Sequence, residues 1–418
     1  MRIVAALGAL SLIVAACGDG GGGDAPEAGA LGAVTVPDGE AIQIRSLNAI
    51  SGDAAFLGTP NQRAVEFAIE DFGQIAGHDV AMGTGLDDLC LNEGGQAAAQ
   101  TIVADEDVVG VIGTSCSGAA VAASPVITGA GMVLISPSNT SPSLTSDLEG
   151  TAGSDYHEGY YRTAHNDIFQ GEAVADFVFN DLGLTTAAAI HDGDPYTQGL
   201  AGAFQDAYEA LGGTITTFVG VNKGDTDMTP VLSEVAAGNP ESIYFPIFQP
   251  EGDFIVQQIG GVSGLEDVTL IGADGLLVSD FMGLPETEGM YFSGPPVSFE
   301  GNQNELTGVG DDEFLETYQA AHGEPPSAAF WAHAYDATTM LLQAITDVAV
   351  ETDDGLFIDR QALREALNEL SFDGMIGRIG CDEFGDCGSQ AVAIYAHPDS
   401  SVTDSTQLEV VFEFVGRE

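Results

Sequence analysis

Short apolar segments of strand character alternate with amphipathic helical segments along most of this 418-residue chain. In the first series, strand-like segments at 41–45, 108–112 and 132–135 are separated by helical patterns at 61–72, 96–104 and 119–129. Alternation of strands and helices predicts a parallel sheet that is covered by helices on both faces.

The alternation then starts again, which predicts a second α/β unit. Its strand-like segments are 186–190, 214–218, 242–245 and 268–271, and its helical patterns are 171–179, 198–211 and 252–259. Further helices are expected at 311–322, 332–348 and 360–370, and closing strands at 391–395 and 407–414. About 380 residues outside the N-terminal segment are enough for two units of ordinary size.

The N-terminus has the pattern of a secretory leader. Met1-Arg2 is followed by an apolar run over 3–16 and by Cys17, an order that resembles a bacterial lipoprotein cleavage box. We expect a signal peptide over 1–17 that ends at a lipidated Cys17, and a Gly-rich flexible tether over 18–39. An ordinary signal peptide with an incidental cysteine is the alternative. The remaining chain should be extracytoplasmic, attached by lipid alone to the outer face of the cell membrane, or periplasmic.

Acidic residues dominate the charge of the chain. Asp and Glu number 64 against 9 Lys and Arg, which gives a net charge of −55, and Lys223 is the single lysine. Such a field repels nucleic acid and anionic lipid headgroups, so neither is expected as a partner. The repulsion opposes compaction at low salt and is screened at high salt, which is compatible with a saline habitat.

Four cysteines remain besides Cys17, an even number in an oxidising compartment. Three pairings are possible, and we favour Cys90–Cys116 and Cys381–Cys387 because each joins neighbouring segments. A zinc site is disfavoured because paired C-x2-C spacings are absent, and the acidic 381–387 segment lacks EF-hand spacing. No metal and no cofactor are therefore expected.

Loops that follow the predicted strands carry the candidate binding groups, since ligands of parallel sheets sit beyond the carboxyl ends of strands. The loops 113–118 and 136–142 are rich in hydroxyl groups and backbone donors that can hold a carboxylate, although N-capping alone would also explain them. Loops 191–199, 246–251 and 272–275 offer aromatic side chains and Asp274, which could equally be a turn residue. If the two sheets face each other, a zwitterionic ligand fits between them, with its carboxylate at the donors of the first sheet and its ammonium at Asp274.

At this point the chain resembles the leucine/isoleucine/valine-type solute-binding proteins of ABC transporters. The resemblance extends from about residue 40 to 414, and Cys90 and Cys116 fall where some members carry a disulfide. The matching segments are 47–52, Ser136-Pro137 with Thr140 and Pro142, Arg162-Thr163 with Asp167 and Gln170-Gly171, and Tyr335-Asp336-Ala337.

The resemblance implies a type I periplasmic-binding fold. In this α/β fold two Rossmann-like lobes with parallel sheets are joined by three crossovers. Lobe 1 would comprise 40–160 plus about 297–375, and lobe 2 would comprise 161–296 plus about 376–418.

It also implies roles for particular residues. Ser117 and Thr140 would bind a ligand carboxylate, while the Ser138 carbonyl and Asp274 would receive the ammonium. Tyr196 would close over the ligand from lobe 2. The expected set is completed by Asn139, Phe248 and Leu57. Leu57 stands where members often have an aromatic residue, and Asp274 where some have Glu.

The resemblance thus implies a monomeric binding protein that delivers a branched-chain or other apolar amino acid to an ABC permease. Alternatives are a binder of an amide, urea or small aromatic acid, or a trans-acting sensor of the same fold. An enzyme is disfavoured, because 113–117 does not read G-x-S-x-G and the seven histidines lack metal-site spacing.

Overall fold

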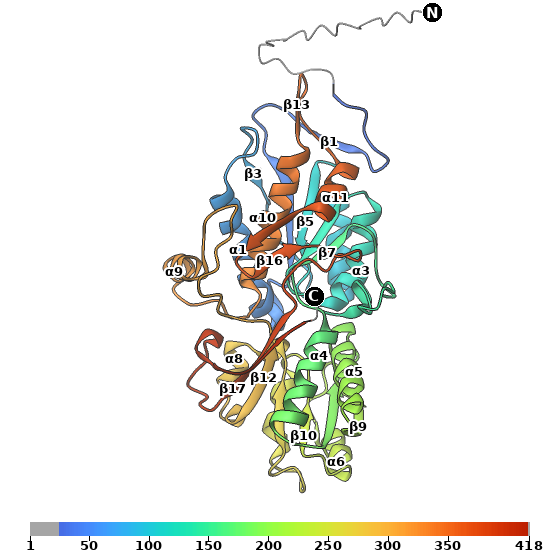
Figure 1. Ribbon diagram of the computed structural model, residues 1–418, viewed down its shortest axis with the longest axis vertical. Coiled ribbons are helices and arrows are strands. Elements are labelled where there is room, and N and C mark those ends of the chain that lie inside the picture. The colour runs from blue at the N-terminus through green and yellow to red at the C-terminus, as the bar shows by residue number, and fades with distance from the viewer. Residues whose placement is uncertain (1–24, 417–418) are drawn as a thin grey trace, which may run out of the picture.

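The computed structural model describes residues 25–416, in which two lobes are stacked along the long axis of the molecule (Figure 1). The predicted signal peptide, Cys17 and the first part of the predicted tether lie outside these residues. Both lobes are built on a sheet with helices on its two faces, so the predicted architecture of two α/β units is confirmed.

Lobe 1 contains a parallel sheet with the strand order β3-β2-β5-β6-β7, and β4 also pairs with β2. Its strands are β2 (Ile42–Asn48), β3 (Val80–Ala81), β4 (Leu86–Asp87), β5 (Val108–Gly113), β6 (Val133–Ser136) and β7 (Tyr160–Arg162). All of β5 is buried, as expected for a central strand between two helical layers.

Helices cover both faces of this sheet. On one face α1 packs with α10, and on the other α2 packs with α3. The helices of lobe 1 are α1 (Ala55–Phe72), α2 (Asn92–Val103), α3 (Ser117–Gly129), α9 (Asp311–His322), α10 (Trp331–Val348) and α11 (Arg360–Glu369).

Lobe 2 contains a sheet with the order β18-β17-β12-β11-β10-β8-β9. Strands β8 to β12 run parallel, whereas β17 and β18 add antiparallel. The strands are β8 (Thr186–His191), β9 (Thr214–Gly220), β10 (Ser242–Tyr244), β11 (Thr269–Gly272), β12 (Met290–Gly294), β17 (Ala391–His397) and β18 (Glu409–Val415).

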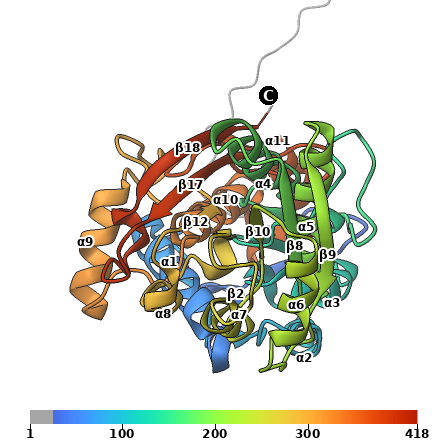
Figure 2. The ribbon, with the colours of Figure 1, turned by 90° about the horizontal axis from the view of Figure 1, so that it is seen from below.

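Figure 2 shows this second sheet from below, with helices on either side of it. Helices α4 and α5 contribute to the core on one face, and α6, α7 and α8 to the core on the other. Their bounds are α4 (Asp167–Asp176), α5 (Pro195–Ala210), α6 (Thr229–Ala237), α7 (Glu251–Ile259) and α8 (Ser279–Met282).

Two small antiparallel pieces complete lobe 1: a three-stranded sheet and a hairpin. The three-stranded sheet consists of β1 (Ala33–Val36), β14 (Gly355–Asp359) and β13 (Val350–Thr352). The hairpin consists of β15 (Ser371–Gly374) and β16 (Gly377–Gly380). The predicted tether over 18–39 is therefore wrong for β1, because Val34 and Val36 are buried against the lobe and the strand pairs with β14.

The chain crosses from one lobe to the other between β7 and α4, between β12 and α9, and just before β17. Ile376, Ile379 and Cys387 pack in the core of lobe 1, so the chain leaves that lobe just before β17 rather than at about 376. The hairpin was not foreseen, because four of its eight strand residues are Gly or Ser and its apolar pattern is short.

Helix α1 begins at Ala55, six residues before the predicted start, even though it contains Pro60. Proline has no N–H to donate to the carbonyl four residues earlier, which here belongs to Phe56. The hydroxyl of Ser327 donates to that oxygen at 2.7 Å instead. A residue far away in the sequence thus satisfies the backbone group that the proline leaves open.

A buried ion pair joins two of the crossing segments. Arg162 is fully buried, and its Nε donates to the carboxylate of Asp386. Its Nη1 donates to the carbonyls of Asn139 (3.1 Å) and Ser141 (2.8 Å), and its Nη2 to the hydroxyl of Thr145 (2.7 Å). The guanidinium therefore ties the segment after β16 to the loop after β6.

Both favoured disulfides, Cys90–Cys116 and Cys381–Cys387, are present. The second closes the loop that carries Asp386, and backbone bonds pair this loop with Arg162 on both sides (N to Gly385 O, 2.9 Å; O from Cys387 N, 2.9 Å).

We predict that Asp386→Ala destabilises the fold by about 3–5 kcal/mol, because it leaves the Arg162 guanidinium buried without a counter-charge. Asp373→Ala is the matched control, since it removes a pair with Arg378 in which both side chains are more than half exposed. Urea unfolding of both variants measures the difference. Equal losses of stability in the two variants would contradict the role of the buried pair.

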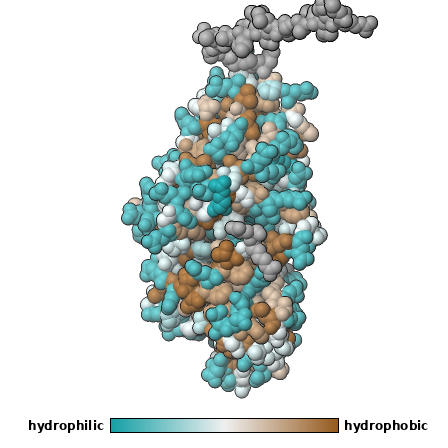
Figure 3. Space-filling view, in the orientation of Figure 1, coloured by the Kyte–Doolittle hydropathy of each residue, from teal (hydrophilic) through white to brown (hydrophobic). Residues whose placement is uncertain are grey.

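Few carboxylates have a basic partner. Ion pairs in residues 25–416 number five, against 64 acidic residues in the whole chain. On the face seen in Figure 3, hydrophilic residues cover most of the surface and hydrophobic ones gather over lobe 2.

Screening of this like charge should stabilise the fold. Between about 0.05 M and about 2 M NaCl we expect the melting temperature to rise by about 5 °C or more, measured by circular dichroism. Sucrose, which is excluded from protein surfaces without screening charge, gives the reference for non-electrostatic stabilisation. A melting temperature that NaCl raises no more than sucrose does would contradict the prediction.

Candidate functional site

A cavity lies between the two lobes, and six of the eight predicted ligand-binding residues line it. The space inside it that can hold solvent is about 20 Å³, which is room for about one water molecule. The six are Leu57, Ser117, Ser138, Tyr196, Phe248 and Asp274. The remaining lining residues are Ser115, Cys116, Gly275 and Phe330.

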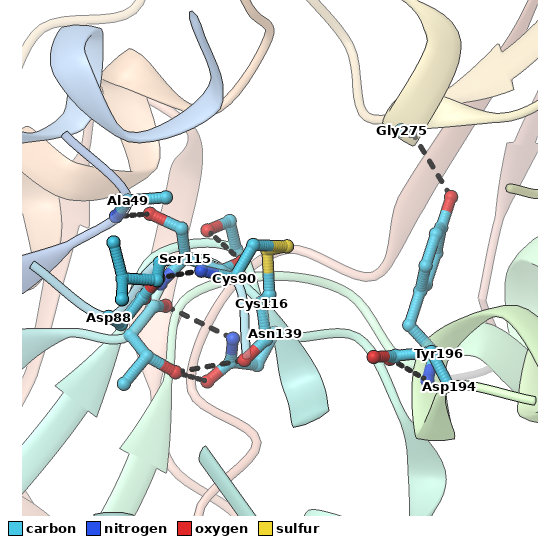
Figure 4. The surroundings of a disulfide bond; sticks show 12 residues. Ala49, Asp88, Cys90, Ser115, Cys116, Asn139, Asp194, Tyr196 and Gly275 are labelled. Carbon is cyan, nitrogen blue, oxygen red and sulfur yellow. Dashed lines mark hydrogen bonds between the residues drawn. A yellow bond between two sulfur atoms is a disulfide. The ribbon is translucent and has the colours of Figure 1, made fainter. Parts of the chain in front are cut away.

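Lobe 1 contributes the loop after β5 and the N-terminus of α3, where Ser117 is the first helical residue. The carboxylate of Asp88 holds this loop by accepting from the backbone N–H groups of Ser115 (2.7 Å) and Cys90 (2.7 Å). Burial raises the pKa of Asp88 to about 7, although these backbone donors act in the opposite direction. Together with the Cys90–Cys116 disulfide, Asp88 fixes the loop that faces lobe 2 (Figure 4).

The loop after β6 places Ser138 in the cavity, where its hydroxyl donates to the carbonyl of Ser115 at 3.0 Å. Asn139 does not line the cavity, because its side chain is bonded to Thr114 and to the hydroxyl of Tyr160. Thr140 is also outside the lining, and its buried hydroxyl has no hydrogen-bond partner among residues 25–416.

Lobe 2 contributes Tyr196 from the first turn of α5. Asp194 caps this helix by accepting from the N–H of Tyr196 at 3.0 Å, and Pro195 occupies the first helical position. The hydroxyl of Tyr196 donates to Asp274 Oδ1 at 3.1 Å and accepts from Gly275 N at 3.1 Å, as Figure 4 shows for Gly275. A tyrosine in this position orients the carboxylate.

An aromatic wall stands beside Tyr196. The rings of Tyr196 and Phe248 lie 5.1 Å apart, and the ammonium of Lys223 is 5.8 Å from the centre of the Phe248 ring. Lys223 also pairs with Asp194 at 3.0 Å. The only lysine of the chain is thus used to support the α5 end of the site.

Asp274 is the carboxylate of the cavity, and only 7% of its surface is exposed. Burial raises its pKa to about 6, although hydrogen bonds from Gln170 and Tyr196 act in the opposite direction. Asp167 lies nearby, fully buried, and neither of its carboxylate oxygens has a hydrogen-bond partner among the described residues. Burial and the charge of Asp274 raise the pKa of Asp167 well above its usual value. A cation in this cavity would relieve both carboxylates.

The lobes touch beside the cavity, where α3 meets α5. A Cβ atom added to Gly118 would lie 2.6 Å from Oδ2 of Asp194, so the close approach depends on the missing side chain. The ends of two helices from different lobes therefore meet at the edge of the site, which corresponds to a closed arrangement.

Sequence reasoning did not assign a binding role to several residues here. Asp167 and Gln170 were noticed only as part of a segment that matches a family. Phe330 has no signal in the sequence, since its place in the lining depends on how the lobes meet, whereas Ser115 lies in the hydroxyl-rich loop 113–118 but is given no role of its own. The loop-after-strand rule could have found Ser115, because it lies two residues after β5.

Two α/β lobes around a shared cavity define the class of proteins that bind a ligand by enclosing it. The chain matches the model of the periplasmic binding protein family over residues 41–395, and it belongs to that family. The family resemblance and the type I fold seen in the sequence are confirmed, and the chain is a binding protein rather than an enzyme.

Individual relatives are similar over most of their length. The leucine-, isoleucine-, valine-, threonine- and alanine-binding protein of Pseudomonas aeruginosa is 26% identical over 373 residues, which cover 87% of this chain and 92% of that protein. The leucine-binding protein LivK of Thermotoga maritima has a TM-score of 0.75 at 24% identity, covering 90% of this chain and 99% of that chain. A benzoate-bound solute-binding protein of R. palustris has a TM-score of 0.71 at 18% identity, covering 90% and 98%.

Over residues 25–416, no helix is both long and apolar enough to cross a membrane. In the same part of the chain, no group of three or more His, Cys, Asp or Glu side chains is arranged to hold a metal ion.

Asp274 should cost stability in the ligand-free protein. Because its pKa is raised on folding, the folded state retains a proton that the unfolded state releases, and stability falls as pH rises from about 4 to about 6. Asp274→Asn should therefore be more stable than the wild type by roughly 1–3 kcal/mol at pH 8, with the difference vanishing near pH 4. Urea unfolding across this pH range measures it, and an advantage that does not change with pH would contradict the burial of an ionised carboxylate.

Proposed function

We propose that this chain is an extracytoplasmic, lipid-anchored solute-binding protein that captures a branched-chain or other apolar amino acid and delivers it to an ABC permease. The observation that carries the proposal is that a helix N-terminus with hydroxyl donors and a carboxylate lie on opposite sides of the cavity. The N-terminus of α3 with Ser117 lies on one lobe, and Asp274 lies on the other. An α-amino acid presents a carboxylate and an ammonium that match these two ends.

The first contact is made by the ligand carboxylate. Backbone N–H groups at the start of α3 have no acceptor within the helix, and the hydroxyls of Ser117 and Ser138 lie beside them. Hydrogen bonds from such donors to an ionised acceptor are stronger than bonds between neutral groups. Lobe 1 therefore supplies the anion-binding half of the site.

The second contact closes the lobes. The ammonium would pair with Asp274, whose charge is otherwise offset only by hydrogen bonds from Gln170 and Tyr196. An apolar side chain of the ligand would lie against Leu57, Phe248 and Phe330. Because the ligand bridges the lobes, it binds the closed form better than an open one and shifts the protein towards closure.

An aromatic acid suits this cavity less well. A benzoate-like ligand has no ammonium, so it would leave Asp274 and Asp167 without a cation and add a further negative charge. An amide or urea is neutral and would likewise leave the two carboxylates uncompensated. The charges of the site favour a zwitterion over the other ligands considered from the sequence.

The remaining parts of the proposal concern the anchor and the partner. Lipid on Cys17 would hold the protein at the membrane, and the chain between Cys17 and β1 would serve as the tether. We infer a monomer, since the cavity is completed by the two lobes of one chain. A trans-acting sensor would use the same cavity, so the partner that reads the closed form separates the two functions.

Calorimetry on the chain from residue 18 onward tests the ligand class. L-Leucine, isoleucine and valine should bind, whereas 4-methylpentanoate, which lacks the ammonium, and 3-methylbutylamine, which lacks the carboxylate, should bind at least about 100-fold more weakly. Urea, acetamide and benzoate complete the panel. Tight binding of benzoate or an amide without binding of any amino acid would overturn the proposal.

Asp274→Ala should weaken amino acid binding at least tenfold, because a desolvated charge pair loses one partner, a loss of roughly 2–5 kcal/mol. Asp280→Ala is the control, since Asp280 is an exposed carboxylate of the same lobe. The dissociation constants come from calorimetry at pH 7.5. Unchanged affinity in the Asp274 variant would reject the assigned role.

A further inference from the structure

Asp274 is the end of a buried chain of hydrogen bonds. Gln170 in α4 donates from Nε2 to Asp274 Oδ1 at 2.8 Å and to Ser293 Oγ at 2.9 Å. On its other side, Oε1 of Gln170 lies 2.5 Å from Nε2 of His165. His165 and Gln170 are fully buried, so water does not compete for these bonds.

The chemistry of these side chains decides which group donates and which accepts along this series of hydrogen bonds. If the amide of Gln170 were reversed, its oxygen would face the carboxylate of Asp274, and two acceptors would repel each other. With the amide as found, Oε1 needs a donor, so His165 must carry its proton on Nε2. Burial lowers the pKa of His165 to about 4, which keeps the ring neutral with a single N–H.

His165 lies where the chain passes from lobe 1 to lobe 2. It belongs to the segment between β7 and α4, which is one of the crossings. Its ring stacks on Phe330 at 6.2 Å with an interplanar angle of 20°, and Phe330 lines the cavity. One end of the hydrogen-bonded chain is thus in a crossing segment and the other is at the ligand cavity.

We propose that His165 and Gln170 are positioning residues that hold Asp274 in the orientation that receives the ligand's cation, and that they tie this orientation to the crossing segment between the lobes. This inference rests on the proposed function, because it assigns the support of the same site. His165 acts through Gln170 and touches no ligand itself. A movement of the segment between β7 and α4 that displaces His165 would release the amide of Gln170. Asp274 would then lose the hydrogen bond from Gln170.

Other charged or titratable groups also face Asp274 and are part of its titration. They are Asp167 from α4, Tyr196 from α5 and Tyr244 from β10, while the buried Arg162 acts on Asp167. None of these groups is held in position by the Nε2 proton of His165, which is bonded to Gln170. Loss of the Gln170 donor removes a hydrogen bond to the ionised form of Asp274, which should raise its pKa.

Three substitutions separate positioning from simple packing. His165→Gln places an amide N–H the same number of bonds from Cα as Nε2 of His165, and it should preserve the chain. His165→Asn carries the same amide one methylene shorter, and it should break the chain. Gln170→Leu removes the donor to Asp274. Ser293→Ala removes the second acceptor of Gln170, together with the bonds of Ser293 Oγ to the Tyr244 hydroxyl (3.1 Å) and the Gly272 carbonyl (3.4 Å), and leaves the bond from Gln170 to Asp274.

The primary measurement needs no ligand. Carbon-13 NMR of aspartate-labelled protein, with Asp274→Asn to assign the signal, follows the carboxyl of Asp274 through its titration. We expect its midpoint to rise by about half a pH unit or more in His165→Asn and Gln170→Leu, and to stay near the wild-type value in His165→Gln and Ser293→Ala. Leucine affinity at pH 6.5 should fall about three- to tenfold in the first two variants only.

Equal midpoints in His165→Asn and His165→Gln, or an unchanged midpoint in Gln170→Leu, would overturn the inference. A purely structural role would lower the melting temperature of both His165 variants without separating their midpoints. If Gln170→Leu does not fold, the comparison of the midpoints in His165→Asn and His165→Gln is sufficient by itself. If the wild type binds no amino acid, the proposed function fails, while the titration of the ligand-free protein still decides the positioning role.

Discussion

A carboxylate that is removed from water must be compensated, and this requirement governs the site of the protein. Asp274 is almost fully buried between the lobes, and two neutral donors, Gln170 and Tyr196, offset only part of the cost. Asp167 adds a second buried carboxylate close by. In the proposed function a cation compensates these carboxylates, and the helix end on lobe 1 receives an anion at the other side.

Other buried contacts of the fold hold the loops around these two halves. Asp88 and the Cys90–Cys116 disulfide fix the loop of lobe 1, and the Arg162–Asp386 pair joins two crossings beside it. The hydrogen-bonded chain through Gln170 reaches from the cavity into one of these crossings. Under the proposed function, ligand contact and lobe movement would involve the same buried polar groups.

Much of the fold was predictable from the sequence, because buried strands such as β5 and amphipathic helices such as α9 have strong patterns. Elements that depend on a distant partner were not: in α1 the hydroxyl of Ser327 replaces the donor that Pro60 lacks, and β1 is held by β14. For the site, the loop rule located residues that follow strands directly. The family resemblance adds Asn139 to the ligand set, but its side chain is bonded to Thr114 and Tyr160 and lies outside the lining. His165 gives no local signal, because its role depends on Gln170 and Phe330.

A crystal structure of the protein with L-leucine tests the central claim most directly. The account predicts that the ligand nitrogen lies within about 3 Å of a carboxylate oxygen of Asp274, and that its carboxylate meets Ser117 and the N-terminus of α3. A ligand bound in the reverse direction, or held outside the cavity between the lobes, would contradict it.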